Sequence, residues 1–244
     1  MRIKLTICYD GTDFCGWQVQ PNGRTVQEEL ENAVLDLTGE KVRVTGSGRT
    51  DSGVHAMGQV AHFDTDSDIP PERFCKALNA RLPQDVRVIK SERATSDFYS
   101  CRGAKRKTYK YFAYLSEIEN PLKERYAVRL DKGLDVESMK RACKAFLGEH
   151  DFKGFCASGS SIKTTVRTIY ALDIDFNGED LVFTVTGNGF LYNMVRIIVG
   201  TLVKVGENKA TEADIEKMLA TGERALGGKT LLAKGLRLES VVYE

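Results

Sequence analysis

The chain has 244 residues, 42% hydrophobic and 28% charged, which suits one globular domain or two closely joined halves and excludes a disordered or fibrous chain. Its 35 basic and 34 acidic residues give a net charge of +1, so nucleic-acid binding would have to depend on local charge distribution. The six cysteines form no CxxC pair, which favours reduced thiols in a cytoplasmic protein over disulfides or structural zinc. The N-terminus lacks a signal-peptide pattern, and the apolar run 190–205 is too short and too charged to span a membrane.

The first half of the chain begins with a strand pattern, because apolar side chains alternate over residues 2–9. Thr25-Val-Gln-Glu28 has the pattern of a capping box and begins a predicted helix that Gly39 ends. Short strands are predicted at 42–44, 60–63 and 86–89, and a second helix at 70–82.

The second half repeats this order. A strand is predicted at 109–115, followed by a helix that begins after Asp135 and ends before Gly148. Residues 167–176 and 181–186 are predicted to form a hairpin over the Asn177-Gly178 turn. Apolar residues between 191 and 202 have the spacing of a buried helix face, and Thr211 and Gly222 bound a last helix.

Each half thus approximates β-α-β-β-α-β, the order of ferredoxin-like (RRM-like) units. We predict an α+β fold in which two such halves are related by a pseudo-twofold and joined in one mixed, mostly antiparallel central sheet. Helices are expected on one side of this sheet and the catalytic cleft on the other. The predicted halves are residues 1–104 and 105–244, which together form one catalytic domain, with residues 93–107 as the crossing segment.

The most unusual local stretch runs from Gly46 to His55, where three glycines alternate with small polar residues around Arg49 and Asp51. Such a loop lets backbone and short side chains approach a ligand closely. An ordinary glycine turn, with Asp51 capping a local backbone group, would have a similar composition. A phosphate-binding loop is not indicated, because the GxGxxG spacing fails at Asp51.

This loop also carries a resemblance to a known family. Gly48-Arg-Thr-Asp51-Ser-Gly-Val-His55-Ala-Met-Gly-Gln-Val resembles the catalytic motif of the TruA family of tRNA pseudouridine synthases. Four further segments are similar to family motifs and stand in the family's order: 9–20 (Tyr-Asp-Gly to Gln-Val-Gln), 106–111 (Arg-Lys-Thr-Tyr-Lys-Tyr), 190–200 and 233–238. The five matches together span essentially the whole chain.

The resemblance implies an isomerase that detaches uracil from its ribose, rotates it and rejoins it through carbon 5. No metal and no organic cofactor are implied. The implied substrate is tRNA, at uridines 38, 39 and 40 of the anticodon stem-loop. The resemblance also implies a homodimer with tRNA lying across both subunits, and no sequence feature shows the dimer interface.

Asp51 aligns with the family's catalytic aspartate, and it could attack the sugar, add to the base or abstract a sugar proton. Arg196 aligns with an arginine that pairs with this aspartate, although an isolated arginine on an apolar helix could equally snorkel to the surface. Tyr109 aligns with a tyrosine that stacks on the target uracil, whereas the default role of a strand tyrosine is core packing.

Arg49 matches an arginine that enters the RNA stack and helps to evert the target nucleotide, although it could simply pair with a nearby acid. A run without acidic residues next to Tyr109 is predicted to contact phosphates, with a solvated basic face as the alternative; its cations are Arg102, Lys105, Arg106, Lys107 and Lys110. The three histidines show no metal-ligand spacing, and His55 is expected to orient the loop through hydrogen bonds.

Two other functions remain open at this point. A non-catalytic RNA-binding module would carry exposed aromatic residues on its sheet, and Tyr109-Lys-Tyr111-Phe112 only weakly resembles such a pattern. A nucleoside or glycoside hydrolase would need a second carboxyl facing the first, for which Asp64, Asp66 and Asp68 are candidates.

Overall fold

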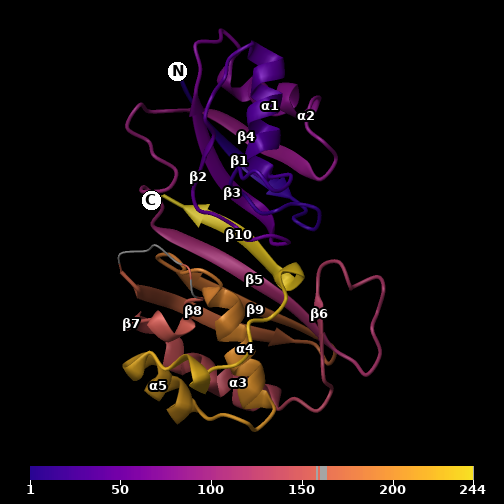
Figure 1. The fold of residues 1–244 in the computed structure, drawn as a ribbon, viewed down its shortest axis with the longest axis vertical. Coiled ribbons are helices and arrows are strands. Elements are labelled where there is room, and N and C mark those ends of the chain that lie inside the picture. The colour runs from indigo at the N-terminus through magenta and orange to yellow at the C-terminus, as the bar shows by residue number, and fades with distance from the viewer. Residues whose placement is uncertain (158, 160–163, 244) are drawn as a thin grey trace. The chain divides into compact units, whose positions relative to one another are not determined.

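The computed structural model describes residues 1–157, 159 and 164–243, and the chain folds into two compact units (Figure 1). The first unit comprises Met1–Lys105 together with Arg237–Glu244, and the second comprises Arg106–Leu236. The predicted boundary between residues 104 and 105 lies close to the point after Lys105 where the chain passes from the first unit to the second. The closing segment, which was predicted to belong to the C-terminal half, lies in the first unit.

The first unit follows the β-α-β-β-α-β order. Its elements are β1 (Arg2–Tyr9), α1 (Val26–Thr38), β2 (Thr45–Gly46), β3 (His55–Asp64), α2 (Phe74–Asn79), β4 (Val86–Ala94) and the late strand β10 (Leu236–Val242). Strands β4, β1 and β3 are antiparallel neighbours, and β2 pairs antiparallel with β3. Strand β10 pairs parallel with β3, with Arg237 opposite His55 and Leu238 opposite Ala56. This pairing places the last strand of the chain beside the strand that begins at the end of the Asp51 loop.

Burial follows the predicted periodicity in this unit. Ile3, Leu5 and Ile7 of β1 are fully buried, while the residues between them are partly exposed. Helix α1 begins where the Thr25 side chain accepts a hydrogen bond from the Glu28 backbone, and it ends at Gly39 in the left-handed conformation. Helices α1 and α2 lie side by side (Figure 1). The amphipathic elements therefore build one apolar core for the first unit.

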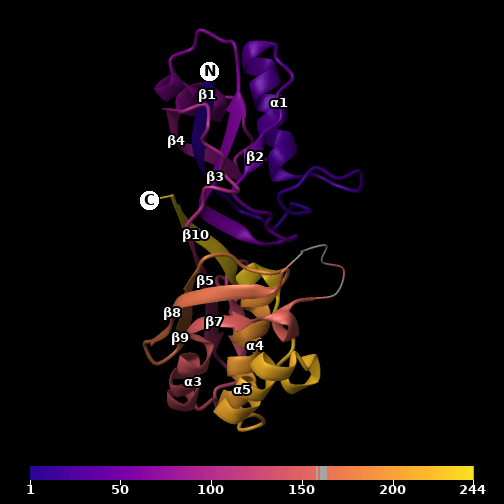
Figure 2. The ribbon, with the colours of Figure 1, turned by 90° about the vertical axis from the view of Figure 1, so that its left-hand side faces the viewer.

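The second unit contains β5 (Arg106–Leu115), β6 (Val128–Leu130), α3 (Val136–Ala142), β7 (Gly148–Asp151), β8 (Val166–Phe176), β9 (Asp180–Gly187), α4 (Met194–Gly206) and α5 (Glu212–Thr221). Strands β5, β9, β8 and β7 are antiparallel neighbours in that order, and β6 pairs parallel with β5. Helices α3, α4 and α5 gather below the sheet in Figure 2. The strands and helices together confirm the predicted α+β class.

Helix α4 is the most buried helix of the second unit. Ile198, Val199 and Leu202 are fully buried on it, as the apolar spacing predicted. The hairpin of β8 and β9 also forms over Asn177-Gly178, where Gly178 has a φ of 95° and the Asn177 side chain accepts a hydrogen bond from the Asp180 backbone. Asp135 and Thr211 cap α3 and α5 as predicted.

Several boundaries differ from the sequence predictions. The strand predicted at 42–44 was wrong: Val44 is buried, but its N–H donates to the Glu31 side chain, and the β-pairing falls on Thr45–Gly46 instead. The helix predicted at 70–82 is shorter, because a 3-10 turn at Pro71–Arg73 precedes α2. Strands β6 and β7 were not predicted, since runs of three or four residues carry little periodicity. None of the helices formed by the described residues has the length and hydropathy needed to cross a bilayer.

Candidate active site

The loop between β2 and β3 holds Asp51 at the surface of a buried hydrogen-bond network. Thr50, just before it, is buried, and Asp51 itself is partly exposed. The Tyr9 hydroxyl lies 2.7 Å from Thr50 Oγ1, and the Trp17 backbone N–H donates to the Thr50 carbonyl over 3.0 Å. The Val54 N–H donates to the Asp51 carbonyl over 3.1 Å, which closes the turn. Asp51 is therefore presented by a backbone that is tied down on both sides.

A second part of this network lies under the start of the loop. Gln59 is fully buried on β3. Its side-chain oxygen accepts from Ser47 Oγ over 2.6 Å, and its amide nitrogen donates to the Gly48 carbonyl over 2.9 Å. An amide is suited to this position because it offers both an acceptor and donors. Gln59 thereby provides hydrogen-bond partners for the Ser47 hydroxyl and the Gly48 carbonyl at the start of the loop.

The segment after β1 packs directly against the loop at two glycines. A Cβ on Gly16 would lie 2.6 Å from the Thr50 carbonyl oxygen, and Gly16 has a φ of 89°. A Cβ on Gly11 would lie 2.1 Å from the Val54 carbonyl oxygen. Between them, the Phe14 carbonyl accepts from Ser52 Oγ over 3.1 Å. Any larger residue at either glycine would push this segment off the Asp51 loop.

Burial also determines the state of Tyr9. Removal from water raises the pKa of its hydroxyl, and hydrogen bonds from Thr50 and Gln59 only partly oppose this effect. Tyr9 therefore stays a neutral phenol at physiological pH, able both to donate and to accept a hydrogen bond.

Arg49 lies two residues before Asp51, and its side chain is exposed. Within the described residues its guanidinium makes no ion pair. An exposed arginine on a well-anchored loop is able to reach a ligand. The contact of Arg49 with RNA stays a prediction.

In the second unit, Tyr109 and Tyr111 lie on the same face of β5, opposite Val185 and Phe183 of β9. The Tyr109 ring is buried to 9% exposure and meets Phe190 edge to face, with ring centroids 5.1 Å apart. The Tyr111 hydroxyl donates to the Leu232 carbonyl over 2.8 Å. Tyr109 thus packs against an aromatic neighbour, and its ring is largely buried.

Arg196 lies on the first turns of α4 and is only partly exposed. Its Nε donates to the Leu231 carbonyl over 2.6 Å and its Nη1 to Asn193 Oδ1 over 2.5 Å. The guanidinium also lies close enough to Tyr111 to oppose the rise that burial causes in the pKa of that tyrosine. These hydrogen bonds hold the Arg196 guanidinium against the protein. They exclude the alternative that Arg196 extends freely to the surface.

The predicted basic segment is divided by the alternation of β5. Arg102 and Lys105 are exposed ahead of the strand, and the Arg102 guanidinium lies 5.4 Å from the centre of the Tyr99 ring. Arg106 and Lys110 share one face of β5, where Arg106 lies 5.1 Å from the Tyr170 ring centre. Lys107 shares the other face with Tyr109. The three cations of β5 are therefore divided between its two faces.

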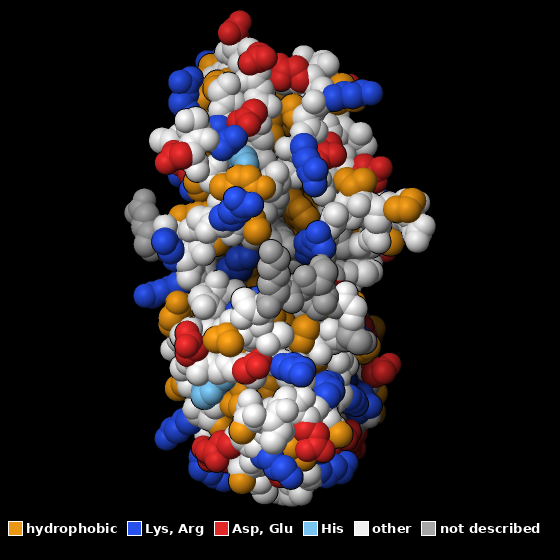
Figure 3. Space-filling view, turned by 60° about the vertical axis from the view of Figure 1, so that its left-hand side comes forward, with side chains coloured by type: hydrophobic (Ala, Val, Ile, Leu, Met, Phe, Trp, Pro, Cys, Tyr) orange, Lys and Arg blue, Asp and Glu red, His pale blue; other side chains and the backbone are white. Residues whose placement is uncertain are grey.

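The three histidines do not come together in a second candidate site. Each histidine has its own partner: His55 Nδ1 accepts from Gly11 N–H, His62 Nδ1 contacts Ser100 Oγ, and His150 Nε2 contacts the Leu147 carbonyl. Within the described part of the chain, no group of three or more potential ligands could hold a metal ion. Figure 3 shows acidic and basic side chains interspersed over the face that it presents, in keeping with the net charge of +1.

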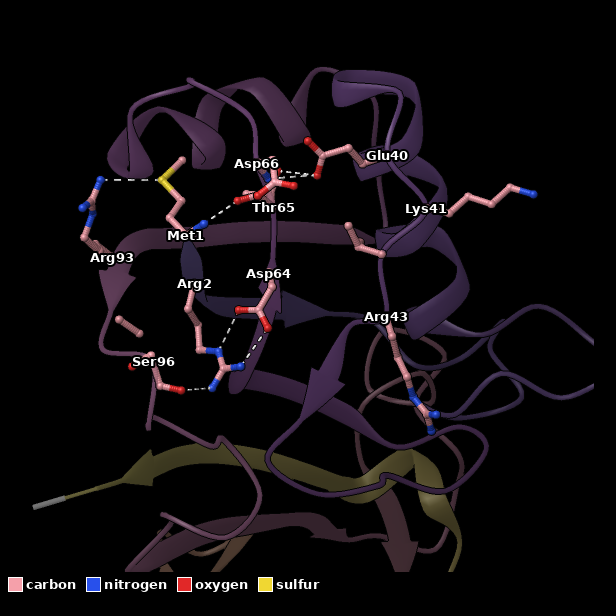
Figure 4. Close-up of a pocket in the computed structure, with 12 residues that line it drawn as sticks. Met1, Arg2, Glu40, Lys41, Arg43, Asp64, Thr65, Asp66, Arg93 and Ser96 are labelled. Atoms are coloured by element: carbon pink, nitrogen blue, oxygen red, sulfur yellow. Dashed lines mark hydrogen bonds and ion pairs between the residues drawn. The ribbon is translucent and has the colours of Figure 1, made fainter.

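A pocket of about 880 Å³ lies elsewhere in the first unit (Figure 4). Its lining includes no residue of the Asp51 loop. Arg2 is already paired with both oxygens of Asp64, at 2.8 and 2.7 Å, and Lys41 points away from the other labelled side chains. The pocket has no convergent set of free polar groups, so we do not assign chemistry to it.

The comparisons with known proteins agree with the motifs around this loop. The family described as tRNA pseudouridine synthase matches residues 6–102 and 142–244, which include Asp51 and Arg196 but leave out Tyr109 and the basic segment beyond Arg102. The chain belongs to the tRNA pseudouridine synthase A family. Relatives matched over nearly their whole length carry the name of this family.

Among its relatives, tRNA pseudouridine synthase A 2 of Clostridium perfringens is 47% identical over 242 residues, covering 99% of each chain. tRNA pseudouridine synthase A of Caldicellulosiruptor bescii is 46% identical over the same length and coverage. A solved Cbf5-Nop10-Gar1 complex is similar over 97% of this chain, at 14% identity and a TM-score of 0.40. The chain spans about half, 48%, of that protein's chain.

Proposed function

We propose that this protein isomerises uridine to pseudouridine in the anticodon stem-loop of tRNA, at positions 38, 39 and 40, with Asp51 as the catalytic carboxylate. The support is an aspartate held by a buried network in a chain that is 47% identical to a named tRNA pseudouridine synthase. The reaction breaks the C1′–N1 bond and forms a C1′–C5 bond. The proton on C5 leaves to solvent and N1 gains a proton, so neither mass nor oxidation state changes.

The proposed role of Asp51 depends on its being ionised and fixed. Positive charge develops on the sugar as the glycosidic bond breaks, and an adjacent carboxylate stabilises it or forms a bond to it. We propose that the guanidinium of Arg196 pairs with Asp51 and favours the charged form. The two donors of Arg196 to Leu231 and Asn193 would hold it in position for that contact. Attack on the sugar, addition to the base and abstraction of a sugar proton are all compatible with this arrangement.

The remaining residues are proposed to bind RNA. Tyr109 would stack on the target uracil, braced by Phe190, with its hydroxyl near carbon 5. Arg49 would enter the space that the everted nucleotide leaves, since eversion costs a few kcal/mol that a replacing side chain can offset.

Phosphate contacts are assigned to Arg102, Lys105, Arg106, Lys107 and Lys110 on the surfaces described above. We expect Arg102→Glu with Lys105→Glu to weaken tRNA binding and to reduce its salt dependence, whereas Lys132→Glu, on an exposed turn, serves as the matched control. Unchanged affinity and salt slope in the double variant would remove the assignment.

The same resemblance supports a cytoplasmic homodimer whose two subunits share one tRNA. Light scattering at the working concentration is expected to give twice the chain mass, and a monomer would remove this part of the proposal.

A non-catalytic RNA-binding module is the second candidate, and the outer face of the first unit's sheet argues against it. Lys4 and His62 lie opposite each other on β1 and β3. Phe98 and Tyr243 already cover them: the Lys4 ammonium is 5.4 and 5.3 Å from the two ring centres, and His62 is only 4% exposed. The surface on which RRM-type modules stack bases is thus occupied by the chain itself. The hydrolase candidate is also weakened, because Asp64 is engaged with Arg2.

The test uses purified protein without added metal or cofactor and a tRNA transcript tritiated at uracil carbon 5. Release of tritium into water with no free uracil would establish isomerisation. Free uracil would instead indicate a hydrolase, and tight binding without any release would indicate a binding module.

A further inference from the structure

Two groups compete for one ring nitrogen of a buried histidine behind the Asp51 loop. His55 is 5% exposed at the start of β3. Its Nδ1 lies 3.0 Å from the backbone nitrogen of Gly11, which donates to it. The same Nδ1 lies 3.1 Å from Oδ1 of Asp10. The Asp10 oxygen is also bound by the backbone and hydroxyl of Thr12, at 3.0 and 2.6 Å.

One protonation state of the ring cannot satisfy both neighbours. A backbone N–H only donates, so the contact with Gly11 requires a lone pair on Nδ1 and a neutral ring protonated at Nε2. A hydrogen bond to the Asp10 carboxylate requires a proton on Nδ1. Protonating the ring would therefore favour Asp10 and leave the Gly11 N–H facing another N–H in a buried place.

The Gly11 backbone is the link to the catalytic loop. It lies so close to Val54 that a Cβ would come within 2.1 Å of the Val54 carbonyl oxygen. The Val54 N–H in turn closes the turn on the Asp51 carbonyl. The Gly11 carbonyl accepts from Phe14 N–H over 3.1 Å, and the Phe14 carbonyl holds Ser52. A shift of Gly11 would thus reach Asp51 by two routes, through Val54 and through Phe14 and Ser52.

The charged and titratable groups around His55 come from three elements. Asp10 follows β1, and Cys8 lies on β1 within electrostatic reach of Asp10 and Arg237. Arg237 of β10 stands opposite His55 in register and pairs with Glu239 over 2.9 Å. Of these groups, Asp10 contacts the ring directly, whereas Arg237 is paired with Glu239 on the neighbouring strand.

We propose that His55 is a positioning residue whose neutral ring holds the Asp10–Gly11 segment against the Asp51 loop, and that its protonation releases this segment and lowers the rate. The proposal rests on the catalytic role of Asp51 proposed above. Because histidines gain their proton between pH 5 and 8, the effect falls on the acidic side of neutrality.

The test compares His55→Asn, His55→Ala and the control His150→Asn in the tritium-release assay between pH 5 and 8. Asparagine places an oxygen acceptor near the position of Nδ1 and does not titrate, whereas alanine leaves Gly11 without an acceptor. We expect about a tenfold loss of kcat from pH 8 to pH 5 in wild type and in His150→Asn, and a flat profile for His55→Asn. For His55→Ala we expect a loss of about 10- to 100-fold at every pH.

A readout that needs no activity is the nitrogen NMR spectrum of the His55 ring. A bare Nδ1 at pH 8, gaining a proton as the pH falls while the Gly11 amide begins to exchange, would support the proposal. A protonated Nδ1 at pH 8, or an acid decline that persists in His55→Asn, would overturn it. If wild type itself released no tritium, the proposed function would fail, whereas full activity of His55→Ala beside an active wild type would defeat only the role of His55.

Discussion

Removing one hydroxyl beneath the Asp51 loop should slow the reaction as well as destabilise the protein. The change is Tyr9→Phe, which deletes the partner of Thr50 Oγ1 and leaves ring packing intact. Tyr9 is 3% exposed and Thr50 6% exposed, so water cannot replace the lost hydrogen bond without local opening. Thr50 is directly followed by Asp51, and its carbonyl is held by Trp17.

The expected magnitude follows from the burial of the two groups. Leaving a buried hydroxyl unsatisfied costs about 1–3 kcal/mol, and for a chain of this size each kcal/mol lowers Tm by roughly 2–4 °C. The catalytic cost depends on how far the carboxylate moves. A misplacement of about 1 Å can slow a positioned reaction by roughly 100-fold, so we expect a decrease in kcat of about 10- to 100-fold.

Tyr114→Phe is the matched control for this experiment. The Tyr114 side chain is fully buried in the second unit, and its hydroxyl donates to Glu124 and accepts from Asn120 N–H, at 2.7 and 2.9 Å. It should lose at least as much stability as Tyr9→Phe while keeping kcat within about twofold of wild type. The reasoning would be refuted if the two variants lost activity equally, or if Tyr9→Phe were less stable but fully active.

Three further predictions concern other parts of the protein. Tyr109→Phe should keep tRNA affinity in a filter-binding assay and slow tritium release if its hydroxyl moves the carbon-5 proton, whereas full activity would leave stacking as its only role. Arg196→Ala should lose about 3–5 kcal/mol in urea unfolding together with activity, and a variant that stayed stable and active would disprove the pairing with Asp51. Burial raises the pKa of Tyr9, Tyr111 and Tyr243 above the unfolded value near 10. The folded state therefore favours the protonated phenols. Their contribution to the stability of the fold should be fully present below about pH 10 and should be lost as the pH rises above it. Unfolding midpoints that do not change between pH 9 and 11 would contradict this.

Elements whose ends carry local signals were predictable from the sequence. Thr25 and Gly39 bound α1, and Asn177-Gly178 joins β8 to β9, because caps and tight turns depend on a few adjacent residues. The misplaced strand at 42–44 shows the limit of this approach. Val44 is apolar and buried, yet its N–H is taken by Glu31 of α1, a partner 13 residues away that no local pattern reveals.

Asp51, the proposed catalytic residue, was singled out from its motif, but the residues that support its loop were not. Tyr9, Gln59 and Trp17 contact the Asp51 loop or its neighbours. All three lie in the segments that carry the family resemblance, but no role was predicted for them, because their hydrogen bonds join residues far apart in the sequence. A polar residue within a strand, such as Gln59, was a further available signal.

Strand alternation could also have shown in advance that Arg106 and Tyr109 occupy opposite faces of β5. The pairing of β10 with β3, by contrast, follows from tertiary packing that no local pattern encodes.

The central claim is that the carboxylate of Asp51 performs chemistry and does not merely bind RNA. The most direct measurement is single-turnover tritium release by Asp51→Asn, which keeps the shape of the side chain, with tRNA affinity measured on the same sample. We expect affinity within about threefold of wild type and a rate lower by at least about 1,000-fold, since an amide cannot supply a negative charge or a nucleophile. A rate near that of wild type with normal binding would contradict the account.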